Sequence, residues 1–328
     1  MPVKLRSRSP AQSVLISGAG VAGLATAYWL DRFGFEVTIV ERTGSAAKAN
    51  YPVNVHGAAI EVVERMGAFS RLWAARAHKP GLRFVNADGH PIGSIASEDL
   101  IDDAPNRHFE VRRSVLSSAL QDLTRGREIR HRFEDCIDVL KNGQAGVEVR
   151  FRSGAEQRFD IVIGADGMHS ITRAMVFGPR APANRYLGFC FNVFFDSASQ
   201  HSSPRWSSGR VALVGDAAHT PSFMSRKGSS LALIGAYLLA GELAAHVDPT
   251  DAFASYEGMA WPFMRLSQML AFKEGGSLLM PRAREGLDAR DAILAAMQAS
   301  GDASSHSEQW GQTNSAFKLP DYTRLIAN

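Results

Sequence analysis

The sequence has few cysteines, little net charge and no long uncharged apolar run. Its 328 residues include two cysteines, Cys136 and Cys190, which form neither a CxxC motif nor any metal-ligand spacing. A disulfide framework is therefore not expected, and the reducing cytoplasm is the expected location. The formal net charge of +3 is too small to indicate nucleic acid as a partner.

Targeting, membrane and metal signals are also missing. The N-terminal segment is basic but lacks the apolar core of a secretory signal. The longest apolar run, Ser229 to Ala245, is short and contains Glu242, so it predicts a buried helix and no membrane span. The ten histidines form no HExxH motif, and no GxSxG motif occurs. We therefore name no metal ligand and no catalytic acid or base.

A βαβ unit is visible near the N-terminus. Ser13 to Gly20 is a short apolar run that predicts a buried parallel strand. A segment of helical length follows and ends at Gly34, and Phe35 to Arg42 predicts a second strand. Strand, helix and strand in this order form a βαβ unit.

Three glycines stand between the first strand and the helix. Gly18, Gly20 and Gly23 form G-x-G-x-x-G, in which the first permits a tight turn, the second lets the backbone approach a pyrophosphate, and the third allows close packing. Glu41 ends the second strand, where a carboxylate can accept from both ribose hydroxyls. The combination predicts dinucleotide binding, with a merely structural glycine-rich turn as the alternative.

Two later segments place an aspartate after a predicted strand. Asp160 to Arg173 contains Asp166, and Gly209 to Phe223 contains Gly215 and Asp216. Each aspartate taken singly could be a helix cap. Together, and in this order after the glycine motif, the two aspartate segments are a far more specific signal than either aspartate alone.

The remaining elements are predicted from periodicity and turns. Helices are expected over 58–66, 112–123 and 229–245 and after Pro281, a hairpin over 81–95, and a meander whose last strand is 158–166. The helical stripe 260–272 is expected to face the core. Beyond Ala299 the sequence is polar and predicts a mobile tail.

With these three fingerprints in order, the chain resembles the FAD-dependent aromatic hydroxylases, a family similar to p-hydroxybenzoate hydroxylase and the tetracycline-inactivating monooxygenases. The resemblance implies an α/β fold: a Rossmann-like FAD-binding domain with a discontinuous, shortened β-sheet substrate domain. It assigns residues 1–70, 99–178 and 205–300 to the FAD-binding domain, 71–98 and 179–204 to the substrate domain, and 301–328 to a C-terminal tail.

The resemblance also implies which residues contact FAD. They are Gly18, Gly20, Ala22, Gly23, Glu41, Arg42, Arg113, Asp166, Gly215, Asp216, Pro221 and Gly228. Glu41 and Arg42 would lie at the adenosine end, and Asp216 would accept from the ribityl hydroxyls. Asp166 would serve both FAD and the approaching NADPH. The helix beginning near Gly228 would direct its N-terminal amides at the flavin.

The implied activity is hydroxylation of an aromatic or polyketide-like small molecule, with NADPH or NADH as reductant and molecular oxygen as cosubstrate. An FAD oxidoreductase without oxygen insertion is one alternative, and a non-catalytic flavin-binding remnant is another. The substrate, the choice between NADPH and NADH, and the oligomeric state are not decided by the sequence.

The chain departs from the family at two places. Arg226 stands where the family usually has glycine, so its side chain could crowd the flavin or add positive charge beside it. Only 49 residues separate Asp166 from Asp216, less than half the family spacing. Either this bridge is naturally short or engineered, or the sequence omits a segment. A truly short bridge would leave strand edges of the folded protein unpaired and prone to aggregate, which favours the second explanation.

Overall fold

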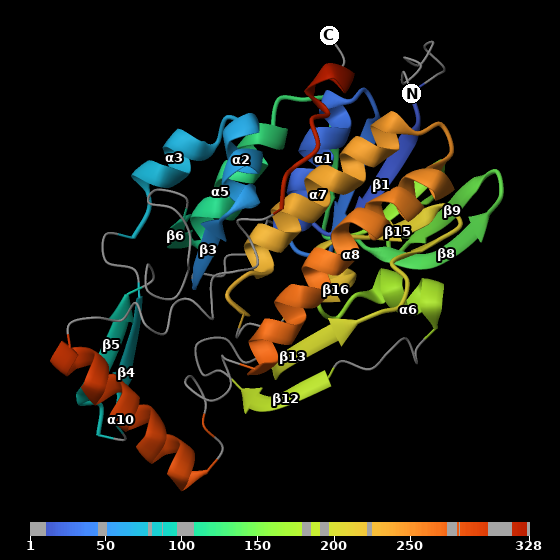
Figure 1. The fold of residues 1–328 in the computed structure, drawn as a ribbon. Helices are drawn as coiled ribbons and strands as arrows, with labels where there is room; N and C mark the ends of the chain where they lie inside the picture. The colour runs from blue at the N-terminus through green and yellow to red at the C-terminus, as the bar shows by residue number, and fades with distance from the viewer. Residues whose placement is uncertain are drawn as a thin grey trace.

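A six-stranded sheet lies at the centre of the chain (Figure 1). The structure is a computed structural model that describes residues 11–44, 51–77, 81–86, 88–96, 108–178, 185–190, 197–221, 225–273, 281, 283–300 and 317–326. The sheet consists, in spatial order, of β14 (Ser207–Ser208), β15 (Val211–Leu213), β11 (Ile161–Gly164), β1 (Ser13–Ser17), β2 (Glu36–Glu41) and β7 (Arg130–Phe133). All neighbouring pairs are parallel except β14 with β15.

Each face of this sheet is covered by a different layer. Val14 and Ile16 of β1 pack in the cluster that contains α1 (Val21–Arg32) and α7 (Gly228–Ala245), whereas Leu15 packs with the meander of β8 (Ile137–Gly143), β9 (Gly146–Phe151) and β10 (Glu156–Phe159). Successive side chains of a strand point to opposite faces, so a strand covered on both sides is apolar throughout. This is why the predicted strand Ser13 to Gly20 is a continuous apolar run.

A second, two-stranded sheet lies beside α7. It pairs β3 (Pro52–His56) antiparallel with β6 (His108–Arg112), opposing Asn54 to Glu110. Helices α2 (Ala58–Arg65), α3 (Phe69–Ala74) and α5 (Arg113–Thr124) pack around it, and α2 also contacts α7. This arrangement places β3 and β6 against the beginning of α7.

The part expected to bind substrate is small. β4 (Gly81–Val85) pairs with β5 (Pro91–Ala96) as the predicted hairpin, and α10 (Arg284–Ser300) packs on it, with the Arg290 guanidinium carbon 5.8 Å from the Phe84 ring. In Figure 1 this unit lies at the lower left, away from the central sheet. Strands β12 (Arg185–Cys190), β13 (Ser197–Ser202) and β16 (His219–Thr220) form a further small sheet. The proposed domain boundaries stay a prediction.

One strand prediction is wrong. Residues 158–166 do not form one meander strand, because the chain passes from β10 to the central sheet at Asp160, whose Oδ2 accepts from Ser13 N and Ser13 Oγ, both at 2.8 Å. Further along the chain, β13 pairs with β12 and β16 before the chain reaches β14 and β15.

The long helices agree with the sequence. Among the described residues, α7 is long and apolar enough to cross a membrane, but 78% of its apolar window is buried inside the protein, as expected of a core helix. The stripe 260–272 falls within α8 (Pro249–Lys273), where Ala260, Phe263 and Met264 are buried.

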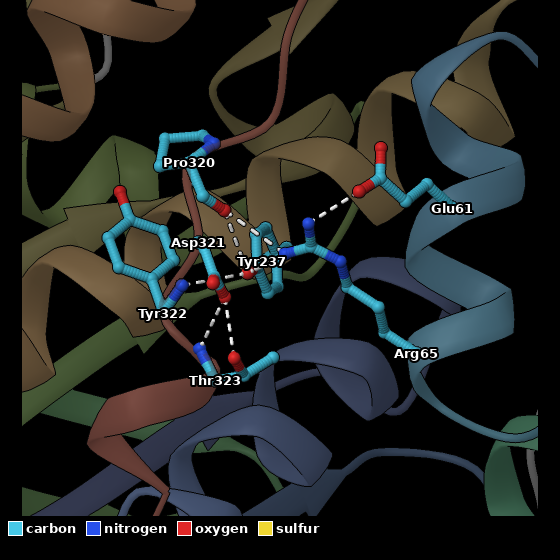
Figure 2. A network of polar contacts seen from close by, with 7 residues as sticks. All are labelled: Glu61, Arg65, Tyr237, Pro320, Asp321, Tyr322 and Thr323. Carbon is cyan, nitrogen blue, oxygen red and sulfur yellow. Dashed lines mark hydrogen bonds and ion pairs between the residues drawn. The ribbon is translucent and has the colours of Figure 1, made fainter.

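The end of the chain corrects the predicted mobile tail. Residues 301–316 lie outside the described residues, but 317–326 pack against α2 and α7 (Figure 2). Tyr237 Oη donates to Pro320 O at 2.9 Å, Arg65 Nη1 donates to the same oxygen at 3.1 Å, and Tyr322 N donates to Tyr237 Oη at 3.2 Å. Leu319 and Tyr322 are buried, so apolar contact holds this segment as well. We call residues 317–326 the C-terminal strap.

Candidate cofactor site

The three sequence fingerprints meet at one edge of the central sheet. Strands β1, β11 and β15 are parallel neighbours, so their carboxyl ends lie side by side, where open α/β sheets bind ligands. A Cβ added to Gly18 would lie 3.0 Å from the Asp166 Cα, and one added to Gly215 would lie 2.6 Å from the Ala22 Cβ. The glycine loop, the Asp166 loop and the Gly215 turn are therefore in direct contact.

The three motif glycines have different structural reasons. Gly18 has φ of +109°, and its added Cβ would lie 2.5 Å from Ala165 O, while that of Gly23 would lie 1.9 Å from Gly18 O. Both positions need glycine for the fold itself. At Gly20, however, an added Cβ would have no neighbour within 4 Å.

Gly20 is also the N-cap of α1, and it gives that helix no side-chain cap. No side chain of Gly20 therefore caps the backbone amides of the first turn, which lie at the positive end of the helix dipole. This is the geometry that a pyrophosphate group requires, so the loop fits a dinucleotide cofactor.

Glu41 lies against the glycine loop. Its Oε2 accepts from Ala19 N at 2.8 Å, and its Oε1 accepts from Thr43 N at 3.0 Å and Thr43 Oγ1 at 2.9 Å. The carboxylate is half-buried at the end of β2, while Arg42 beside it is exposed. Glu41 thus stands where the sequence places the ribose acceptor.

Asp166 supports the beginning of a helix. Its Oδ2 accepts from Thr172 N and Thr172 Oγ1, both at 2.9 Å, and its Oδ1 accepts from Ser170 Oγ. The N-cap of α6 (Ile171–Phe177) is Ser170, whose Oγ accepts from Arg173 N at 2.9 Å. Asp166 thus assists the cap without being the N-cap residue. Its half-buried position at the sheet edge is compatible with the predicted cofactor role as well.

Arg173 connects two of the fingerprints, and its role was missed from the sequence. Its Nη1 donates to Ala217 O at 2.9 Å and its Nη2 donates to Met168 O at 2.7 Å. Burial lowers the pKa of Arg173, while Asp166 and Asp216 oppose that effect. Arg173 lies within the quoted motif Asp160 to Arg173, but nothing local indicates that its side chain reaches the Gly215 turn.

Asp216 is exposed within the turn η1 (Gly215–Ala217). Thr220 Oγ1 donates to its carbonyl oxygen at 2.9 Å, which holds the turn without using the carboxylate. Gly215 has φ of +65°, a conformation that favours glycine. Asp216 is therefore an exposed residue in a turn that Thr220 and the Gly215 conformation hold in place.

The other predicted contacts lie around β3, β6 and α7. Arg113 begins α5, with its guanidinium carbon 5.4 Å from the centre of the Tyr51 ring. Pro221 is buried after β16, and Gly228 is the first residue of α7. An added Cβ at Gly228 would have no neighbour within 4 Å, as at Gly20.

A buried polar group lies beside the start of α7. His56 is buried in β3, and its pKa is lowered to about 3 by burial first and then by Lys227, His108 and Arg226. It therefore stays neutral at physiological pH. In the described part of the chain, no group of three or more His, Cys, Asp or Glu side chains could hold a metal ion.

Comparison with known proteins also indicates an FAD-binding protein. A family model described as "FAD binding domain" matches residues 11–202. A flavin-dependent monooxygenase from an unknown prokaryotic organism is 26% identical, with 86% of this chain and 95% of the relative covered. The uncharacterized protein Rv1260 of Mycobacterium tuberculosis (strain H37Rv) is 30% identical, with 79% and 92% covered. The crystal structure of tetracycline destructase Tet(55) matches with a TM-score of 0.77 and 25% identity, over 96% of this chain and 100% of that one.

The alignment also shows that this chain is shorter inside. The alignment with the prokaryotic monooxygenase has 368 positions, whereas it includes only 86% of the 328 residues of this chain, about 282. About 86 positions of the alignment therefore have no counterpart in this chain. The short bridge between Asp166 and Asp216 is where the sequence predicts such a loss.

Proposed function

The chain belongs to the family of FAD-dependent aromatic hydroxylases, and from this we propose that it uses NADPH or NADH to hydroxylate an aromatic or polyketide-like small molecule. It is an FAD-dependent monooxygenase. The reductant and the substrate class are the proposal. The relatives named above do not favour an oxidoreductase without oxygen insertion or a non-catalytic remnant.

The observation that carries the substrate class is the likeness to tetracycline destructase Tet(55), which extends over 96% of this chain. Tetracyclines are fused-ring polyketides with an aromatic ring. The resemblance of the three sequence fingerprints implies the same family, and therefore the same substrate class.

The chain's own residues provide binding and electrostatics. We propose that the twelve predicted positions hold FAD, with Gly20 at the pyrophosphate, Glu41 at the ribose and Asp216 at the ribityl chain. FAD, once bound, supplies the redox chemistry. In this proposal, the edge of the central sheet at the carboxyl ends of its strands orients the cofactor. The β12–β13–β16 sheet and the β4–β5 hairpin form the substrate-binding side.

The test is substrate-dependent oxidation of NADPH by the FAD-loaded protein, with tetracycline and 4-hydroxybenzoate as probes and NADH in a parallel series. Under ¹⁸O₂ one labelled oxygen atom should enter the product, as seen by mass spectrometry. Products without label, or NADPH oxidation that no probe of either class accelerates, would count against the proposal.

A further inference from the structure

Arg226 has a backbone conformation that normally requires glycine. It is one of two non-glycine residues with positive φ in the described part of the chain, with φ of +54°. Left-handed conformation is unfavourable for an L-residue with a long side chain.

The Arg226 side chain turns toward the β3–β6 sheet. Its Nη2 lies 2.7 Å from Glu110 Oε2, and the side chains of Arg226 and Glu110 are 16% and 10% exposed. With its oxygen toward Arg226, the Asn54 amide accepts from Nε at 3.2 Å and from Nη2 at 3.3 Å. Asn54 and Glu110 are opposite each other in the β3–β6 register, so one guanidinium joins both strands.

The first turn of α7 is attached to the same sheet. Ser230 Oγ donates to Asn54 O at 3.1 Å and accepts from His56 N at 3.2 Å. The loop ahead of α7 and the first turn of α7 are therefore both bound to β3. The Gly215 turn packs against α7 as well, so this attachment lies next to the predicted cofactor edge.

Stability alone does not account for such a pair. Burying two charges costs desolvation that their attraction offsets only with good geometry, and apolar side chains often replace such pairs without loss. Arg226 adds the cost of its backbone conformation. A pair retained against both costs points to placement of the loop, as buried ion pairs do where they fix one geometry.

We propose that Arg226 and Glu110 act as positioning residues: their pair fixes the loop before α7 against the β3–β6 sheet and thereby sets the charge and position of the α7 N-terminus toward the flavin ring. Glu110 offsets the charge of Arg226, and the adjacent buried Lys227 remains as a positive charge before α7. The inference rests on FAD binding at this edge, as the proposed function does.

The test compares Glu110→Gln, Arg226→Gly and the double variant with the natural chain. Arg226→Gly suits the positive φ, so it should fold. The readouts are the FAD dissociation constant, the ratio of affinities for reduced and oxidised FAD from the midpoint potential, and the melting temperature without FAD. Asp31→Asn is the matched control, because it removes an equally short pair, 2.7 Å to Arg127, in the last turn of α1.

Reduced flavin carries negative charge, so Glu110→Gln should raise the reduced-to-oxidised affinity ratio about threefold or more, and Arg226→Gly should lower it. The double variant should return near the natural ratio while binding FAD more weakly, because the loop is no longer held. Asp31→Asn should change only the melting temperature.

If both single variants keep the natural ratio and FAD affinity and only melt earlier, the pair is merely structural and the inference is wrong. The inference is also wrong if Glu110→Gln and Arg226→Gly shift the reduced-to-oxidised affinity ratio in the same direction. None of these readouts uses a substrate, so a chain that passes this test and hydroxylates no probe would contradict only the proposed function.

Discussion

At the scale of single residues, the glycine motif separates two positions that the fold requires, Gly18 and Gly23, from one that we propose lies at the cofactor, Gly20. Gly23→Ala would place a Cβ 1.9 Å from Gly18 O, whereas Gly20→Ala meets nothing within 4 Å. Gly20 has φ of −78° and ψ of −173°, which alanine can adopt. The protein's own packing therefore does not require glycine at position 20.

We expect Gly20→Ala to change the free energy of unfolding without FAD by less than about 1 kcal/mol, the size of an N-cap effect. It should weaken FAD binding by about tenfold or more, because the methyl group occupies the approach of the pyrophosphate. Gly23→Ala should instead destabilise the apoprotein by about 1–3 kcal/mol through overpacking. Denaturation and FAD titration of the two variants check this, and normal FAD affinity in Gly20→Ala would remove that residue from the site.

Substitution of Asp216 should weaken FAD binding, whereas substitution of His219 should lower folding stability. Asp216 is exposed in its turn, whereas His219 is buried with its ring centre 4.9 Å from that of Trp206. We expect Asp216→Ala to cost about 1.5–3 kcal/mol of FAD binding, as for a charge-assisted acceptor, and to leave the apoprotein stable. His219→Ala should cost about 1–3 kcal/mol of folding stability through the cavity it leaves. Equal losses of FAD affinity would show that the turn binds no ribityl chain.

At the scale of elements, local patterns predicted most helices and strands and failed where a distant residue decides. The apolar run of β1 and the turns at Asn142 and Ser153 are local signals, and the elements they mark are present. The division at Asp160 depends on Ser13, which is 147 positions away. The pair of Arg226 with Glu110 spans 116 positions, and no spacing rule covers that distance.

The C-terminal strap is the clearest example of an element that composition mispredicts. Polar residues before it suggest a mobile tail, but Tyr322 packs on α7, and a Cβ added to Gly241 would lie 2.1 Å from its ring. Gly241 is thus the position on α7 at which the strap leaves no room for a side chain.

In the full chain, we expect Gly241→Ala to destabilise by about 1–3 kcal/mol, because the strap must move away. In a chain ending at residue 316, the same change should stabilise by about 0.5–1 kcal/mol, the usual gain from replacing a helix-interior glycine. Gly235→Ala is the control, since its added Cβ would make only ordinary contacts, the nearest at 3.5 Å. Denaturant unfolding of the four variants measures the reversal of sign. If Gly241→Ala destabilises both lengths equally, the strap does not press on this face.

At the scale of the whole molecule, the short bridge determines how well the flavin can be enclosed. About 86 aligned positions of the prokaryotic relative have no counterpart in this chain. The bridge instead forms β12 and β13, which make a three-stranded sheet with the two-residue β16. Three short strands present little surface to close over a cofactor.

This leads to an expectation about how the enzyme uses its electrons. Exclusion of water is what keeps an activated oxygen species from being lost before it reaches the substrate. A protein whose intact mass is 35.6 kDa should therefore oxidise NADPH slowly and release hydrogen peroxide in an amount nearly matching the NADPH consumed, with hydroxylated product as the small remainder. Peroxide, NADPH and product measured in one reaction, together with intact mass, test this. Tight coupling of NADPH to product at that mass would contradict the expectation and require another roof over the flavin, such as a partner subunit. A larger mass would show that the natural protein has residues that this sequence lacks, and if peptide mapping places them in the bridge, tight coupling would be the expected result.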